Sequence, residues 1–186
     1  MTTDTSKVTV HMVSSLDFFI ARKDGSISWL ETSDSYEKGA ADEDAVEFIK
    51  TIDCFVMGSG TYEHALILGW PYGDTPTIVL THRDLRADRG SVEFYAGDLR
   101  KLVNDRLKPS YKNIWVVGGA IVARDFLRLK LADDIRIAIM PIMLGDGTLF
   151  VDHIGHEQPL HLKDVTAYKN GLVELWYEIR KGERAT

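Results

Sequence analysis

The sequence predicts an α/β fold built on a mainly parallel sheet, with an antiparallel hairpin at its C-terminal end. Short apolar runs alternate with helical patterns along most of the chain, as in strands joined by helical crossovers. Near the end, two alternating runs flank Asn170-Gly171, a dipeptide that favours a tight hairpin turn. No linker or repeat divides the chain, so we expect a single domain over residues 1–186.

The first expected strand is Lys7–Val13, where apolar residues occupy alternate positions, as in a strand with one buried face. Further runs are almost continuously apolar, which favours strands buried on both faces of a helix-covered sheet. These are Asp53–Met57, Thr77–Thr81, Asn113–Val117 and Ile135–Leu144, with Val92–Ala96 as a weaker candidate. The hairpin strands are expected at Leu160–Tyr168 and Leu172–Arg180.

Three segments carry apolar residues at helical spacing. Glu43–Thr51 has an acidic first turn, which suits the positive end of a helix dipole. Asp98–Lys108 is followed by Pro109, which we expect to end that helix. Gly119–Leu129 directly follows a predicted strand.

Composition narrows the class of protein. Of the 186 residues, 45% are hydrophobic and 27% charged, as in an ordinary globular domain. Lys and Arg total 22 against 28 Asp and Glu, and the resulting net charge of −6 opposes binding to a polyphosphate backbone. The longest apolar run, Ile137–Leu144, is too short to span a bilayer, and Met1–Lys7 has no apolar signal core. We therefore expect a cytoplasmic enzyme that binds neither nucleic acid nor membranes.

Cysteine and histidine offer no metal pattern. Cys54 is the single cysteine, so neither an internal disulfide nor the Cys-x-x-Cys of a zinc deaminase is present. Inside an apolar strand, Cys54 is expected to be buried and inert. His153, His156 and His161 lack supporting carboxylate or cysteine spacing, so we interpret them as surface residues and expect no metal site.

Three expected strands end in segments that suit an anionic dinucleotide. Ligands of parallel α/β sheets bind at the carboxyl ends of strands, where helix N-termini present free N–H groups. Glycines let the backbone approach a pyrophosphate, hydroxyls donate to phosphate oxygens, and arginines grip a terminal phosphate. The segments are Gly58-Ser59-Gly60-Thr61-Tyr62-Glu63, Gly118-Gly119-Ala120, and Thr81-His82-Arg83 with Arg86 and Arg89 nearby.

A tight strand-to-helix turn explains each glycine segment taken alone, whereas their recurrence at three strand ends favours a dinucleotide. The Rossmann fingerprint does not account for them, because Gly58-x-Gly60-x-x-Glu63 lacks the third glycine. A P-loop lysine motif is also missing from the sequence.

Several motifs occur in a defined order along the chain. They are Ser15-Leu16-Asp17-Phe18-Phe19-Ile20-Ala21, Asp24-Gly25, Trp29, Met57-Gly58-Ser59-Gly60-Thr61-Tyr62-Glu63, Val79-Leu80-Thr81, Val116-Val117-Gly118-Gly119-Ala120 and Pro141-Ile142-Met143-Leu144-Gly145-Asp146-Gly147. This set resembles the dihydrofolate-reductase-like superfamily. It is most similar to the reductase (C-terminal) domain of the bifunctional riboflavin-biosynthesis deaminase-reductase and its free-standing relatives, over about Val8 to Ile179.

The resemblance implies a three-layer α/β/α fold with a central sheet of about eight strands and NADPH across the carboxyl ends of the strands. It also implies pairing as a homodimer, for which the C-terminal hairpin offers an edge. Carried over by position, the resemblance implies that the pyrophosphate contacts Gly58, Ser59, Gly60, Thr61, Gly118, Gly119, Ala120 and Ile121. It implies that the adenine ribose and its 2′-phosphate contact Thr81, His82 and Arg83. The nicotinamide carboxamide is implied to contact Ile20 and Ala21, and the substrate to contact Trp29.

Two residues depart from the family pattern. Ser59 stands where dihydrofolate reductases usually have the arginine that binds the 2′-phosphate, so Arg83 or Arg86 must take that role and the preference for NADP over NAD is weakened. Phe18 stands where glycine is common, and we expect it to reshape the substrate pocket.

The function implied is an NADPH-dependent reductase of the 5-amino-6-(5-phosphoribosylamino)uracil reductase type, in riboflavin biosynthesis. The alternatives are a reductase of an unidentified small carbonyl or imine, and a non-catalytic nucleotide-binding protein. Asp42 and Asp17 are the candidate proton donors, although Asp42 also suits a helix N-cap and Asp17 a turn. Arg22 and Lys23 have two interpretations, as cations that bind a substrate phosphate or as turn residues that face solvent.

Overall fold

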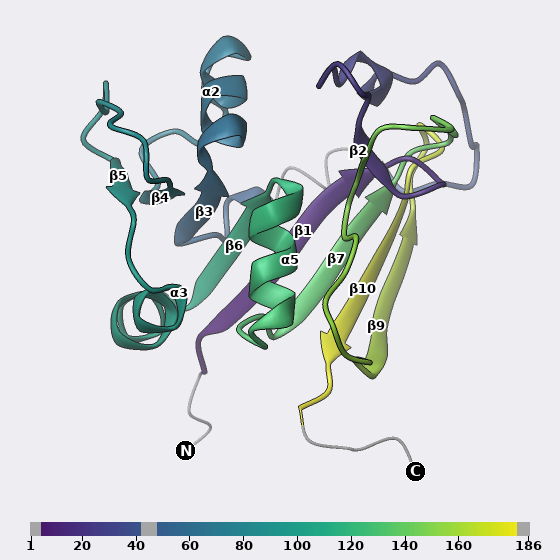
Figure 1. The fold of residues 1–186 in the computed structure, drawn as a ribbon. Coiled ribbons are helices and arrows are strands. Elements are labelled where there is room, and N and C mark those ends of the chain that lie inside the picture. Colours follow the sequence, from purple (N-terminus) through teal and green to yellow (C-terminus); the bar gives the residue numbers. More distant parts are fainter. Residues whose placement is uncertain (1–4, 42–47, 182–186) are drawn as a thin grey trace.

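The computed structural model describes residues 5–41 and 48–181 (Figure 1). Its strands are β1 Lys7–Ser14, β2 Phe19–Ala21, β3 Cys54–Gly58, β4 Thr77–Leu80, β5 Val92–Tyr95, β6 Asn113–Gly118, β7 Asp134–Ile139, β8 Thr148–Leu149, β9 Leu160–Ala167 and β10 Val173–Ile179. Its helical segments are η1 Ser28–Leu30, α2 Ser59–Ile67, α3 Leu99–Lys101, η2 Leu102–Leu107, α4 Lys108–Ser110 and α5 Ala120–Arg128.

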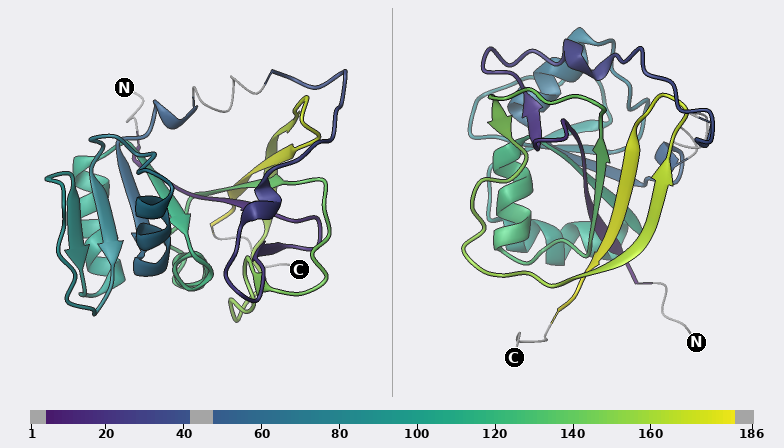
Figure 2. Two further views of the ribbon diagram at one scale, coloured as in Figure 1. Left: turned by 90° about the horizontal axis from the view of Figure 1, so that it is seen from above. Right: turned by 90° about the vertical axis from the view of Figure 1, so that its right-hand side faces the viewer.

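Within these described residues, an eight-stranded sheet has the order β5-β4-β3-β6-β1-β7-β10-β9. Neighbours from β5 to β7 pair in parallel, and the β7–β10 and β10–β9 pairs are antiparallel. In the left view of Figure 2, the β9–β10 hairpin lies at one edge of the sheet, and β4 and β5 lie at the opposite edge. The predicted fold class, a mostly parallel sheet with a C-terminal antiparallel hairpin, is confirmed.

Strand β3 shows why helices cover both faces of the sheet. Successive side chains of a strand point to opposite faces. Cys54 and Val56 belong to one core cluster, to which α5 contributes, while Phe55 and Met57 belong to a second, to which α2 contributes Tyr62. All four β3 side chains are buried, which confirms the expectation from their continuous apolar run. Burial of Cys54 raises the pKa of its thiol to about 12, so the thiol is unreactive.

The predicted strand Ile135–Leu144 is too long, because β7 ends at Ile139. The N–H of Met140 still donates to the carbonyl of Ser14 at 2.8 Å, but Pro141 has no N–H for a ladder bond. The chain therefore leaves the sheet at Pro141 and runs as a loop to β8, which pairs with β2.

The helix predicted over Asp98–Lys108 begins where expected, since the Asp98 carboxylate caps it by accepting from the N–H of Lys101 at 2.9 Å. Its predicted end at Pro109 is wrong, because α4 continues to Ser110 with the proline in its first turn. Pro109 directly follows the π-helical turn η2, so the helical backbone runs without a break from Leu99 to Ser110. The intervening π-helical turn, η2, has no counterpart in the prediction.

The predicted C-terminal hairpin is confirmed. Gly171 adopts a φ of +81°, and the amide oxygen of Asn170 accepts from the N–H of Leu172 at 3.1 Å. Edge strand β9 exposes Leu160, Leu162 and Val165, an apolar strip of the kind that contacts between copies cover. Homodimer formation stays a prediction.

Of the helix predicted over Glu43–Thr51, residues 43–47 lie outside the described part of the chain. The remainder ends in a turn in which the N–H of Thr51 donates to the carbonyl of Phe48 at 3.0 Å. Phe48 packs against the second core cluster and Ile52 belongs to it, whereas Ile49 is exposed.

Candidate functional site

Three adjoining hollows follow the carboxyl edge of the sheet, the end toward which β1 points and at which β2 and α2 lie (Figure 1). The β4 hollow, of about 270 Å³, is lined by Thr81 and His82 among others. The central hollow, of about 430 Å³, lies between the starts of α2 and α5. The β1 hollow, of about 370 Å³, includes His11 and Trp115.

Shared residues join these hollows into one groove. Leu80, Ile121 and Val122 line both the β4 hollow and the central hollow. Ile20, Gly60, Thr61 and Gly119 line both the central hollow and the β1 hollow. The structure therefore brings together segments that follow β1, β3, β4 and β6 in the sequence.

Two helix N-termini meet at the central hollow. Gly58 and Gly119 are the N-caps of α2 and α5, and neither helix has a side chain that caps it. The first N–H groups of both helices thus lack a side-chain acceptor, and the positive dipole ends point the same way as those groups. An anion such as a pyrophosphate would find donors on both sides of this hollow.

Glycine at two positions keeps this geometry possible. A Cβ on Gly60 would meet no protein atom within 4 Å, so the space beside it in the central hollow is open. Gly118 has a φ of +115°, and a Cβ there would collide with the side chain of Met12. The cradle formed by the predicted pyrophosphate residues therefore fits a diphosphate. Ser59, Ala120 and Ile121 also line the central hollow.

The segment after β4 is tied to α2 by an ion pair. The hydroxyl of Thr81 accepts from the N–H of Arg83 at 3.0 Å, which shapes the turn. The Arg83 guanidinium then donates two hydrogen bonds to the Glu63 carboxylate, at 3.0 and 2.6 Å. These bonds lower the pKa of Glu63. A ligand phosphate at Arg83 would have to compete with this carboxylate.

The β2 strand contributes backbone to the groove. Ile20 lines the central and β1 hollows, and Ala21 lines the β1 hollow. Trp29 is buried and lines a separate hollow of about 200 Å³ beside Met140, whereas its neighbours Ile27 and Leu30 line the β1 hollow. A substrate contact for Trp29 stays a prediction, and the geometry places Leu30 nearer to that role.

Asp17 acts as a clamp between two loops. Its carboxylate accepts from the hydroxyl of Ser15 at 2.6 Å and from the N–H groups of Leu144 and Gly145 at 3.0 and 2.7 Å. The hydrogen bond from Ser15, followed by those from the two amides, lowers the pKa of Asp17. These bonds favour the ionised form and weigh against proton donation by Asp17. Asp42, the other candidate, lies outside the described residues.

We expect Asp17→Ala to release the loop that carries Leu144 and Gly145, because both amides lose their acceptor. Hydrogen exchange followed by NMR should show faster exchange at these two amides, with protection in β1 and β7 unchanged. Asp24→Ala is the control, since Asp24 accepts within its own turn, from the N–H of Ser26 at 2.9 Å. Unchanged exchange at both amides in Asp17→Ala would show that the clamp does not hold the loop.

A buried polar cluster at the β1 hollow is absent from the predicted site. His11 Nε2 lies 3.2 Å from the Glu174 carboxylate, which also pairs with Arg136. The three residues come from β1, β10 and β7, so no local motif joins them. Each of these strands also carries other charged or polar residues, so the sequence offers no local signal that singles out His11, Arg136 and Glu174.

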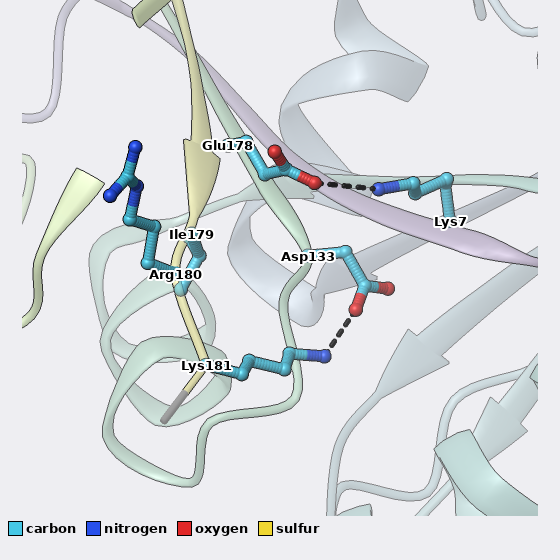
Figure 3. A pocket seen from close by; sticks show the side chains of 6 residues that line it. All are labelled: Lys7, Asp133, Glu178, Ile179, Arg180 and Lys181. Carbon is cyan, nitrogen blue, oxygen red and sulfur yellow. Dashed lines mark hydrogen bonds and ion pairs between the residues drawn. The ribbon is translucent and has the colours of Figure 1, made fainter. Parts of the chain in front are cut away.

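At the opposite end of the strands, a hollow of about 450 Å³ holds ion pairs that satisfy one another (Figure 3). Lys7 lies 3.5 Å from the Glu178 carboxylate, and Lys181 pairs with Asp133. Asp133 also accepts from the N–H of Val8 at 3.0 Å. We interpret this cluster as structural, because its charges tie the start of β1 to the end of β10.

Over residues 5–41 and 48–181, no group of three or more His, Cys, Asp or Glu side chains lies in metal-binding positions. In the same part of the chain, no helix is long and apolar enough to cross a membrane.

Solved structures share this architecture. The crystal structure of a putative riboflavin biosynthesis protein from Shewanella sp. PV-4 matches with a TM-score of 0.80 and 23% identity, over 94% of this chain and 99% of that one. A diaminohydroxyphosphoribosylaminopyrimidine deaminase/5-amino-6-(5-phosphoribosylamino)uracil reductase from Thermotoga maritima matches with a TM-score of 0.68 and 15% identity, over 96% of this chain and 58% of that one. At these identities the likeness shows the fold.

Sequence comparison identifies the family. The uncharacterized protein YwjB of Bacillus subtilis (strain 168) is 32% identical over 92% of this chain and 97% of its own length. The uncharacterized protein YyaP of the same organism is 25% identical over 92% of this chain and 94% of its own. The profile of the RibD C-terminal domain matches residues 69–173. With this match and that to YwjB, the chain belongs to the RibD C-terminal domain family and has the dihydrofolate-reductase-like fold that its motifs predicted.

Proposed function

We propose that this protein is an NADPH-dependent reductase of the 5-amino-6-(5-phosphoribosylamino)uracil reductase type. The observation that carries the proposal is the continuous groove in which two uncapped helix N-termini flank the central hollow. A dinucleotide laid along it would place its diphosphate between α2 and α5, its adenosine end toward Thr81, and its nicotinamide toward Ile20. The fold shared with the deaminase/5-amino-6-(5-phosphoribosylamino)uracil reductase of Thermotoga maritima supports this reaction type.

Bound there, the cofactor would supply a hydride to a C=N or C=O carbon. The residues of this chain would orient the two reactants and keep water away. Ile20 lines the boundary between the central and β1 hollows, and Val13, Leu30 and Trp115 give the β1 hollow apolar walls. Apolar walls exclude water from the hollow, which strengthens the polar contacts made inside it. Asp42 and Asp17 stay the candidate proton sources.

A reductase of an unidentified small carbonyl or imine is the second candidate. The apolar and aromatic walls of the β1 hollow favour it, since they suit an uncharged substrate. Arg22 and Lys23, the cations that would bind a substrate phosphate, are engaged elsewhere. Arg22 donates to the hydroxyls of Ser26 and Ser28, and Lys23 pairs with Asp146 at 2.5 Å. Turnover of NADPH with the phosphoribosylaminouracil substrate, compared with small carbonyl compounds, separates the two candidates.

Titration of the fluorescence of NADPH and NADH tests the cofactor directly and reports its selectivity. We expect Arg83→Ala to weaken the binding of NADPH about 10-fold more than that of NADH, because a charge-assisted contact with the 2′-phosphate is lost. We expect Glu63→Gln to strengthen NADPH selectively, because it removes the carboxylate that competes for Arg83. Arg106→Ala is the matched control, since Arg106 forms a similar exposed pair with Glu93 and neither residue lines one of the three hollows.

Equal losses for the two cofactors in Arg83→Ala would show that Arg83 does not bind the 2′-phosphate. Failure of the wild-type protein to bind either cofactor with a dissociation constant below about 1 mM, a binding free energy of roughly 4 kcal/mol, would refute the proposal of an NADPH-dependent reductase.

A further inference from the structure

His11 has an unusual setting in the wall of the β1 hollow. Its side chain is only 11% exposed, and its ring stacks on Trp115 with 4.5 Å between centroids. The indole N–H of Trp115 donates to the backbone carbonyl of His11 at 3.0 Å, and Phe48 meets the imidazole edge-on at 5.7 Å. These contacts hold the imidazole in one orientation beside the hollow.

The partner of His11 determines which ring nitrogen carries the proton. Burial alone would raise the pKa of Glu174, but hydrogen bonds from His11 and Arg136 outweigh it and lower that pKa. Glu174 is therefore an ionised carboxylate, which can only accept, so Nε2 of His11 must carry a hydrogen. Burial also lowers the pKa of His11, which keeps the imidazole neutral near pH 7. The remaining nitrogen, Nδ1, is then a hydrogen-bond acceptor.

That acceptor is left without a partner. Nδ1 of His11 is buried and makes no hydrogen bond to any residue within 5–41 and 48–181. Leaving a buried polar atom unpaired is unfavourable because the atom loses its hydrogen bonds to water, and nearly all such atoms in folded proteins are paired. An unpaired acceptor on a residue that lines a cavity is accounted for when a ligand supplies the missing donor.

We propose that His11 is a substrate-binding residue whose Nδ1 accepts a hydrogen bond from a ring N–H of a flat heterocycle held in the β1 hollow. The aromatic rings of Tyr72 and Trp115 and the side chains of Val13 and Leu30 line the same hollow and suit the faces of such a ring. Glu174 is a positioning residue, because it fixes the tautomer of His11. The inference rests on the proposed function, which supplies the class of substrate. It adds to that function the residue that recognises the heterocycle of the substrate.

Lumazine, which has ring N–H donors, and 1,3-dimethyllumazine, which has none, serve as probes. We expect the wild-type protein, saturated with NADPH, to bind lumazine at least about 10-fold more tightly, as one hydrogen bond to a buried acceptor provides. His11→Phe keeps the stack on Trp115 and removes the acceptor, so it should abolish this preference. His11→Asn, whose amide oxygen can accept, should restore part of it.

His64→Phe is the matched control, since His64 lines the same hollow but has no buried unpartnered nitrogen. It should change the affinities for both lumazines by the same factor. The proposal is overturned if the wild-type protein binds neither compound or binds both equally. It is also overturned if the His11→Phe variant still prefers lumazine, because the preference would then come from the bulk of the methyl groups.

A second measurement on the wild-type protein is independent of any variant. The ¹⁵N chemical shifts of His11 should show a protonated Nε2 and an unprotonated Nδ1, and lumazine should shift the Nδ1 resonance. The opposite tautomer overturns the proposal. Binding of lumazine without binding of NADPH would refute the reductase function and leave the His11 site intact, so the two failures are distinguishable.

Discussion

Gly60→Leu is expected to weaken NADPH binding by more than about 100-fold while the protein stays folded. Gly60 lies in the first turn of α2 and lines both the central and the β1 hollow. Because a Cβ there would meet no protein atom within 4 Å, a larger side chain enters open space without disturbing the core. The same side chain would occupy the space that the diphosphate needs. Fluorescence titration measures the affinity, and urea unfolding measures the stability.

Gly90→Leu is the matched control for this substitution. Gly90 precedes β5 at the other end of the sheet, and a Cβ there would also meet nothing within 4 Å. It should leave NADPH affinity unchanged. Gly60→Ala should give a smaller loss of affinity and a gain in stability of up to about 1 kcal/mol, since alanine is the better helix former. NADPH binding by Gly60→Leu within twofold of wild type would exclude the central hollow as the cofactor site.

Glu174→Ala is expected to lower the free energy of unfolding by about 3–5 kcal/mol, because it leaves the Arg136 guanidinium buried without a counter-charge. The side chains of Arg136 and Glu174 are only 12% and 8% exposed. Arg136 also lies over the rings of Phe48 and Trp176, at 3.8 and 4.9 Å from their centroids, so it cannot move into solvent without losing both contacts. Urea unfolding followed by tryptophan fluorescence measures the loss.

Glu93→Ala provides the comparison for an ion pair in water. Glu93 accepts from Arg106 at 2.8 Å, but these side chains are about half exposed, so we expect a loss under about 1 kcal/mol. A loss that small in Glu174→Ala would show that Arg136 finds water or another partner.

The same carboxylate predicts how stability depends on pH. Because the pKa of Glu174 is lowered in the folded protein, its contribution is complete above its unfolded value of about 4.3 and is lost as the pH falls through the folded value. The stability of the wild-type protein should therefore fall more steeply below about pH 4 than that of Glu174→Gln. Parallel curves would contradict a lowered pKa.

Most of the fold could be predicted from local patterns in the sequence. Alternation in β1 predicted that Val8, Val10 and Met12 face a core, and all three are buried. Asn170-Gly171 predicted the C-terminal hairpin, and the apolar run through β3 predicted that helices cover both faces of the sheet. Each of these signals lies within a few residues, where backbone geometry alone decides which side chains share a face. Errors occurred where two local rules competed, as at Pro109 and Pro141.

The groove was only partly predictable. The glycine segments after β3 and β6 and the polar turn after β4 are visible in the sequence, because glycine and hydroxyl residues are unusual directly after apolar strands. That these segments line one continuous groove depends on the strand order β4-β3-β6-β1, which places the carboxyl ends of separate strands side by side.

By itself, then, the sequence determined the strands, the hairpin and the residues suited to a dinucleotide. Only the tertiary structure decided their partners. It paired Arg83 with Glu63, joined Asp17 to Leu144 and Gly145, and enclosed His11 with Glu174 in the wall of the β1 hollow. The physical reason is that periodicity and turn preference act within a few residues, whereas the partner of a buried charge is chosen by the packing of strands that are distant in the chain.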